Sequence, residues 1–124
     1  MRTSLSADQI ASYREAGFLV YRGLLSAAEV AELRAGVLDA IATMGKRRIT
    51  GDGANLLEGD AYYDRVYTQR LNLWRISDVV RSYLHRADLG RMLGDLEGID
   101  ALRVWHDQAL IKEPFANPTN LHLD

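Results

Sequence analysis

The sequence predicts an α+β fold, with helices and short strands over residues 6–96 and a β-strand region over residues 101–124. Two helix starts carry the same capping signals, and apolar side chains then recur at the spacing of an amphipathic helix. From residue 101 on, the chain reads as an extended strand followed by a loop and a second extended stretch. A chain of 124 residues is long enough for one domain with one hydrophobic core.

Two helix starts near the N-terminus are marked by capping boxes. Ser6 is followed three residues later by Gln9, and Ser26 is followed three residues later by Glu29. In such a box the two side chains satisfy backbone N–H groups that the first helical turn leaves free. Gly17 ends the first helix, and the second helix continues along an apolar stripe. The predicted helices cover residues 7–16 and 27–43, and the stripe consists of Val30, Leu33, Val37, Leu38 and Ile41.

The middle of the chain predicts an extended segment, a loop and two further helices. Phe18–Tyr21 is β-prone and fits a strand or an extended packed segment. Residues 45–60 are rich in glycine and polar side chains, which indicates a loop and leaves open that it acts as a lid. The further helices are predicted over residues 78–84 and 87–96, with Val79, Val80, Leu84, Leu89, Met92, Leu93 and Leu96 facing the core.

The candidate chemistry lies in residues 101–124. Residues 101–112 read as one long strand with polar side chains on both faces, which favours a strand that lines a pocket. One face consists of Leu102, Val104, His106, Gln108 and Leu110. His122 and Asp124 are two residues apart, so on an extended strand their side chains point the same way. An imidazole and a carboxylate at this spacing can take adjacent positions on a metal ion, as in non-haem iron(II) oxygenases.

Composition narrows the class of partner. The chain has 15 Lys and Arg against 17 Asp and Glu, a net charge of −2, so no nucleic-acid partner is expected. It has no cysteine, so any metal must be held by His, Asp or Glu. No apolar run approaches the length of a membrane span, and the N-terminus lacks the apolar region of a signal peptide. We therefore expect no membrane partner and a cytoplasmic location.

Several blocks of the sequence carry a family resemblance. Leu73-Trp74-Arg75 is one block, and the segment from Arg103 to Pro114 is the most specific, with Lys112 ten residues before His122. The opening blocks are Leu5-Ser6, Gly17-Phe18-Leu19-Val20 and Gly23-Leu24-Leu25-Ser26. Over essentially its whole length the chain resembles the phytanoyl-CoA dioxygenase family of iron(II)- and 2-oxoglutarate-dependent oxygenases.

The resemblance implies a fold, two cofactors and four site residues. The fold would be N-terminal helices packed on the first strands of a double-stranded β-helix of the jelly-roll or cupin type. His122 and Asp124 match two iron(II) ligands, and Gln108 and Lys112 match positions that contact 2-oxoglutarate. The reaction would consume O2 and hydroxylate an aliphatic C–H bond in a small molecule or acyl thioester. An aspartate at position 124 favours a hydroxylase over a halogenase.

The family pattern also has a third iron ligand, a distal histidine, and an arginine that binds 2-oxoglutarate, both after the His-x-Asp motif. Neither follows Asp124 in this sequence, and His85 and His106 both precede the motif. His85 is expected to cap a helix or face solvent, and His106 to be hydrogen-bonded on a strand face. We therefore expect residues 1–124 to be the N-terminal part of one oxygenase domain, inactive alone. The alternative is a non-catalytic helical interaction module derived from such a domain.

Overall fold

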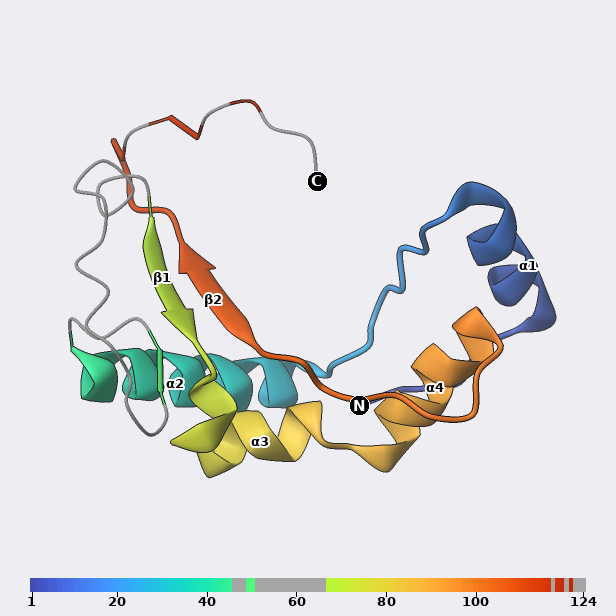
Figure 1. The fold of residues 1–124 in the computed structure, drawn as a ribbon, viewed down its shortest axis with the longest axis horizontal. Coiled ribbons are helices and arrows are strands. Elements are labelled where there is room, and N and C mark those ends of the chain that lie inside the picture. The colour runs from blue at the N-terminus through green and yellow to red at the C-terminus, as the bar shows by residue number, and fades with distance from the viewer. Residues whose placement is uncertain (46–48, 51–66, 117, 120, 122–124) are drawn as a thin grey trace.

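The computed structural model describes residues 1–45, 49–50, 67–116, 118–119 and 121, and these residues form a mixed α+β structure. Figure 1 shows α2, α3 and the two strands at one end of the molecule and α1 beside α4 at the other. The elements are α1 (Ala7–Ala16), α2 (Ala27–Met44), β1 (Thr68–Leu71), the 3-10 helix η2 (Leu73–Arg75), α3 (Asp78–Leu84), α4 (Ala87–Glu97) and β2 (Gln108–Ile111).

The predicted helix starts are confirmed. Ser6 accepts the N–H of Gln9 while the Gln9 side chain accepts the N–H of Ser6, and Ser26 and Glu29 repeat this exchange at the start of α2. Gly17 ends α1 in the left-handed conformation, with φ of 78°. That conformation is strained for residues with a Cβ, which explains why the helix ends at a glycine.

The hydrophobic core lies where α2 packs against η2 and α3. Leu73 is 1% exposed and forms a buried cluster with Ala40, Met44 and Val80. The half-buried side chains packed on this cluster are Leu33, Val37, Ile41, Trp74, Leu84 and Ala109. The predicted stripe on α2 is therefore correct at three of its positions but wrong at two. Those two side chains, Val30 and Leu38, are exposed.

The sheet consists of β1 and β2, paired antiparallel. Its register pairs Thr68 with Ile111 and Leu71 with Gln108. Leu71 also forms an isolated parallel bridge with Ile49 on the other edge of β1. Within the described residues, the outer edge of β2 has no partner strand.

The second end of the molecule is held together largely by polar contacts. The Tyr13 hydroxyl donates to Glu97, and the Arg14 guanidinium donates to backbone carbonyls at the end of α4, including that of Leu96 at 3.4 Å. No residue of α1 is buried, whereas Met92 and Leu96 of α4 are. Of the predicted core positions of α3 and α4, Leu93 is the exception, because it is exposed.

One strand prediction is wrong in extent, and of the two alternatives predicted for Phe18–Tyr21, a strand or an extended packed segment, the strand is not observed. The predicted strand over residues 101–112 is observed only as β2, and residues 101–107 form no strand. Phe18–Tyr21 is not a strand either. Phe18 and Val20 are 66% and 64% exposed, while Leu19 and Tyr21 are half-buried. A strand needs a partner for its hydrogen bonds, and β1 is only four residues long.

No helix in the described part of the chain is both long enough and apolar enough to cross a membrane. Most of the predicted loop over residues 45–60 lies outside the described residues. The lid hypothesis for that loop therefore stays a prediction.

Candidate functional site

The two predicted iron ligands, His122 and Asp124, lie outside the described residues. Among the residues that the structure does describe, no group of three or more His, Asp or Glu side chains is arranged to hold a metal ion. The metal site predicted by the His-x-Asp motif thus stays a prediction.

Gln108 and Lys112 lie on the outer side of β2 and its continuation. Both are exposed, as is Leu110 between them, and they alternate with half-buried Ala109 and Ile111. The Lys112 ammonium donates to the Thr119 hydroxyl at 3.0 Å. An ammonium group has three N–H donors, so this bond leaves two donors that can reach an anion. The Gln108 amide and the Lys112 ammonium thus lie on the exposed side of β2 and its continuation, where both can donate hydrogen bonds to an anion.

Asp107, directly before β2, joins two of the blocks that carry the family resemblance, Leu73-Trp74-Arg75 and the segment from Arg103 to Pro114. Its carboxylate oxygens Oδ1 and Oδ2 accept the backbone N–H groups of Leu73 and Trp74, each at 2.9 Å. Its backbone carbonyl accepts the N–H of Asn72 at 3.0 Å. Asn72 is in the left-handed conformation, with φ of 61°, and its own side chain does not cap η2. Asp107 therefore supplies the cap of η2 from a distant part of the chain.

Sequence reasoning missed this role of Asp107. Its hydrogen-bond partners are 33 and 34 residues earlier in the chain, so no local pattern marks it. The signal appears only in the folded structure, where the Asn72 side chain does not cap the turn into η2. The exposed N–H groups of such a turn require an acceptor from elsewhere.

Trp74 lies beneath a group of basic side chains. The Arg75 and Arg81 guanidinium carbons are 5.2 and 5.9 Å from the centre of its ring system, and the His85 ring is 5.0 Å away at 45°. Arg81 also donates to the Trp74 carbonyl at 3.1 Å, which fixes the end of η2 against α3. The indole nitrogen is buried and makes no hydrogen bond.

The two histidines outside the motif differ in setting. His85 is the C-cap of α3, as the sequence predicts, and its backbone N–H donates to the Arg81 carbonyl. His106 is exposed and lies before β2 begins, so its predicted place on a strand face is wrong. Neither histidine belongs to a metal-binding group of the described residues.

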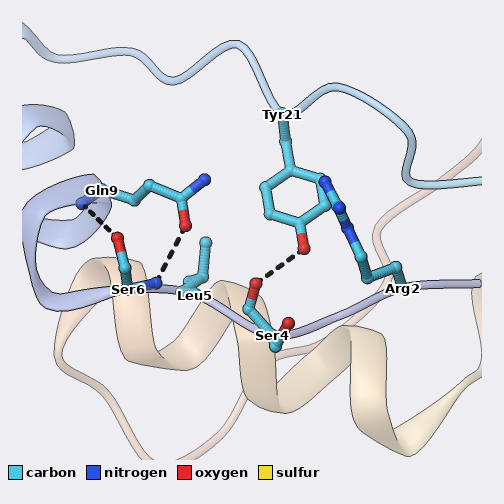
Figure 2. Close-up of a pocket in the computed structure, with 6 residues that line it drawn as sticks. All are labelled: Arg2, Ser4, Leu5, Ser6, Gln9 and Tyr21. Carbon is cyan, nitrogen blue, oxygen red and sulfur yellow. Dashed lines mark hydrogen bonds between the residues drawn. The ribbon is translucent and has the colours of Figure 1, made fainter.

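Two cavities lie away from Gln108 and Lys112. One of about 430 Å³ is mainly apolar and is lined by Tyr13, Leu19, Tyr21, Met92, Leu93, Leu96, Glu97 and Leu102. The other, of about 390 Å³, is shown in Figure 2 and is lined by Arg2, Ser4, Leu5, Ser6, Gln9 and Tyr21.

The polar groups around the cavity of Figure 2 are largely bonded to one another. The Tyr21 hydroxyl donates to the Ser4 carbonyl at 2.6 Å, and Ser6 and Gln9 form the capping box. The Arg2 guanidinium carbon is 5.2 Å from the centre of the Tyr21 ring. These contacts attach the N-terminal segment to the chain that follows α1, which is a structural role.

Two hydrogen-bonded groups with shifted pKa values lie away from Gln108 and Lys112. Two hydrogen bonds from Arg86, at 2.9 and 2.7 Å, hold the pKa of Asp88 well below its usual range. A hydrogen bond from the Tyr83 hydroxyl to Glu32 raises the pKa of Tyr83 to about 12. Asp88 belongs to the first turn of α4, and the Tyr83–Glu32 bond joins α3 to α2, so both contacts stabilise the helical part of the fold.

Comparisons of the chain with known protein families, with curated proteins and with solved structures found no match. The resemblance to the phytanoyl-CoA dioxygenase family therefore stays a prediction from the sequence blocks.

Proposed function

We propose that this chain is the N-terminal part of an iron(II)- and 2-oxoglutarate-dependent dioxygenase. The enzyme would act in the cytoplasm and hydroxylate an aliphatic C–H bond of a small molecule or acyl thioester. The observation that carries the proposal is the contact between two of the resemblance blocks, Leu73-Trp74-Arg75 and the segment from Arg103 to Pro114. Asp107 in the second block binds the backbone of Leu73 and Trp74 in the first. Two of the blocks thus come together next to Gln108 on β2 and Lys112 just past its end.

In this proposal each site residue has one task. His122 and Asp124 hold the iron, which supplies the oxidising chemistry when it is bound. The Lys112 ammonium pairs with a carboxylate of 2-oxoglutarate, and the Gln108 amide donates a hydrogen bond to the same molecule. Gln108 projects from β2, where it is paired with Leu71 of β1, and Lys112 projects from the residue just past the end of β2.

The exposed apolar surface supports the expectation that these residues pack against further β-helix strands. Leu102, Val104 and Leu110 are exposed on or before β2, and Trp105 is 88% exposed. Side chains of this kind in one stretch are typical of a surface that another part of the protein covers. The unpaired outer edge of β2 in the described structure is the place where such a strand would add.

Succinate release from 2-oxoglutarate by the full gene product, with iron(II) and O2, tests the proposal. His122→Ala should abolish it, because the iron would lose a ligand. His85→Ala is the matched control, since it removes a histidine at a helix end, and it should retain activity. Wild-type protein that binds iron(II) but releases no succinate would contradict the proposal. An intact mass of 13.9 kDa for the native gene product would contradict the expectation of further strands.

The alternative function is a non-catalytic interaction module, and the exposure of Phe18 and Val20 favours it. These two apolar side chains lie beside α1, far in sequence from the predicted iron ligands. A module of this kind would bind its partner equally well with and without His122. Retained partner binding by His122→Ala, together with absent succinate release by the wild type, would support this alternative.

A further inference from the structure

We propose that Asp107 is a positioning residue that sets where Gln108 and Lys112 present their side chains to 2-oxoglutarate. The effect on 2-oxoglutarate rests on the proposed function, whereas the anchoring of β2 by Asp107 does not. It starts from the three hydrogen bonds that join Asp107 to the turn between β1 and η2.

Asp107 anchors the start of β2 to the core. Leu73, whose N–H it binds, is 1% exposed and belongs to the buried cluster. Hydrogen bonds from backbone N–H groups to a carboxylate are among the stronger ones in proteins, and here two of them converge on one side chain. The start of β2 is thereby tied to a part of the fold that cannot move without disturbing the core.

This anchor lies directly beside the candidate site residues. Gln108 is the next residue and pairs with Leu71 in the sheet, whereas Lys112 lies just past the other end of the strand. The strand has only four residues, and its outer edge is unpaired in the described structure, so its ladder with β1 leaves it weakly held. Without the Asp107 carboxylate, β2 would be free to shift along or away from β1, and both side chains would shift with it.

Asp107 acts on the site by positioning β2. Asp107 points toward η2 through its hydrogen bonds, whereas Gln108 faces outward, so Asp107 does not itself contact 2-oxoglutarate. Its loss should therefore weaken 2-oxoglutarate binding and spare the iron ligands. Removing a supporting side chain around a site commonly costs about 10–100-fold in affinity or activity.

The experiment compares Asp107→Asn with Asp100→Asn in the full gene product. The asparagine side chain could accept one of the two N–H groups, but its amide nitrogen would face the other donor. Asp100 is exposed and precedes β2, so its replacement removes the same charge from the same segment. We expect Asp107→Asn to raise the KM for 2-oxoglutarate about tenfold, with a much smaller change in kcat and in iron(II) affinity. Asp100→Asn should leave all three unchanged.

Amide hydrogen exchange supplies the second readout. In Asp107→Asn the N–H groups of Leu73 and Trp74 should exchange about tenfold faster than in Asp100→Asn, because one charge-assisted bond is lost. Asp107→Glu keeps the carboxylate, so it should restore the protection of both amides and most of the 2-oxoglutarate affinity. This variant also serves if Asp107→Asn fails to fold.

Faster exchange with an unchanged KM would overturn the positioning role, since Asp107 would then be only a cap of η2. Unchanged exchange would overturn the anchor itself. Wild-type protein without 2-oxoglutarate turnover would refute the proposed function instead, and the exchange measurement would still decide whether Asp107 holds β2 to the core.

Discussion

Replacing Gly36 of α2 by alanine tests how closely α2 and α3 approach each other. A Cβ at this position would lie 2.8 Å from Cγ1 of Val79 and 2.9 Å from its Cβ. Val79 belongs to α3, and a valine in a helix has one strongly preferred rotamer, so it cannot easily turn away. The two helices must therefore separate, or Val79 must take a strained conformation.

The expected magnitude follows from two opposing contributions. Alanine in a helix interior is about 1 kcal/mol more favourable than glycine. Overpacking a tight contact costs about 1–3 kcal/mol, so Gly36→Ala should be neutral to about 2 kcal/mol destabilising. Gly90 of α4 is the matched control, because a Cβ there meets no atom within 4 Å. Gly90→Ala should stabilise by about 1 kcal/mol, which leaves a difference of about 1–3 kcal/mol between the variants.

Urea denaturation followed by circular dichroism measures this difference as a shift between the two midpoints. The dependence on urea concentration should be the same for both variants, so that the midpoints report stability alone. Equal stability of Gly36→Ala and Gly90→Ala would refute the reasoning, since it would mean that α2 and α3 do not touch at Gly36.

Two further predictions concern the core and the acid limit of stability. Leu73→Ala should lower the free energy of unfolding by about 2–5 kcal/mol in the same denaturation assay. Leu110→Ala, at a side chain that is 54% exposed, should lower it by less than about 1 kcal/mol. Similar losses for the two variants would contradict the placement of the core. Hydrogen bonds from the N-terminal ammonium group and from Ser26 lower the pKa of Glu29 to about 2. The ionised form of Glu29 should therefore stabilise the fold above about pH 4.5, and this stabilisation should be lost as the pH falls toward 2. Glu29→Gln should weaken the dependence of the denaturation midpoint on pH between 4.5 and 2, and an unchanged dependence would contradict this role of Glu29.

The helices could be predicted because their determinants are local. Ser6 and Gln9 are one turn apart, and Gly17 ends α1 by its own backbone preference, so a short window of sequence contains the whole signal. Which face of α2 is buried could not be read with the same certainty. Leu38 is exposed while Ala40 and Met44 are buried, because the buried face is decided by where η2 and α3 pack.

The strand over residues 101–112 shows the limit of alternation as a signal. Its residues have the right pattern, but a strand exists only where a partner offers hydrogen bonds. β1 ends at Leu71, the chain then turns at Asn72, and β2 accordingly begins at Gln108, opposite Leu71. Of the four predicted site residues, the structure describes two, Gln108 on β2 and Lys112 just past its end. The contact from Asp107 that orients this strand joins residues more than thirty positions apart and leaves no local trace.

The exposed face of β2 bears on how tightly the proposed site would bind 2-oxoglutarate. Leu110 lies between Gln108 and Lys112 on that face, so any layer that covers Leu110 also removes water from around the other two side chains. An exposed ammonium–carboxylate pair is worth only about 0–1 kcal/mol, whereas the same pair is held more strongly when water is excluded. Under the proposed function, Lys112 should therefore bind 2-oxoglutarate weakly while this face is exposed and much more tightly if a further layer covers it. Covering the apolar surface and activating the site would then be one structural event.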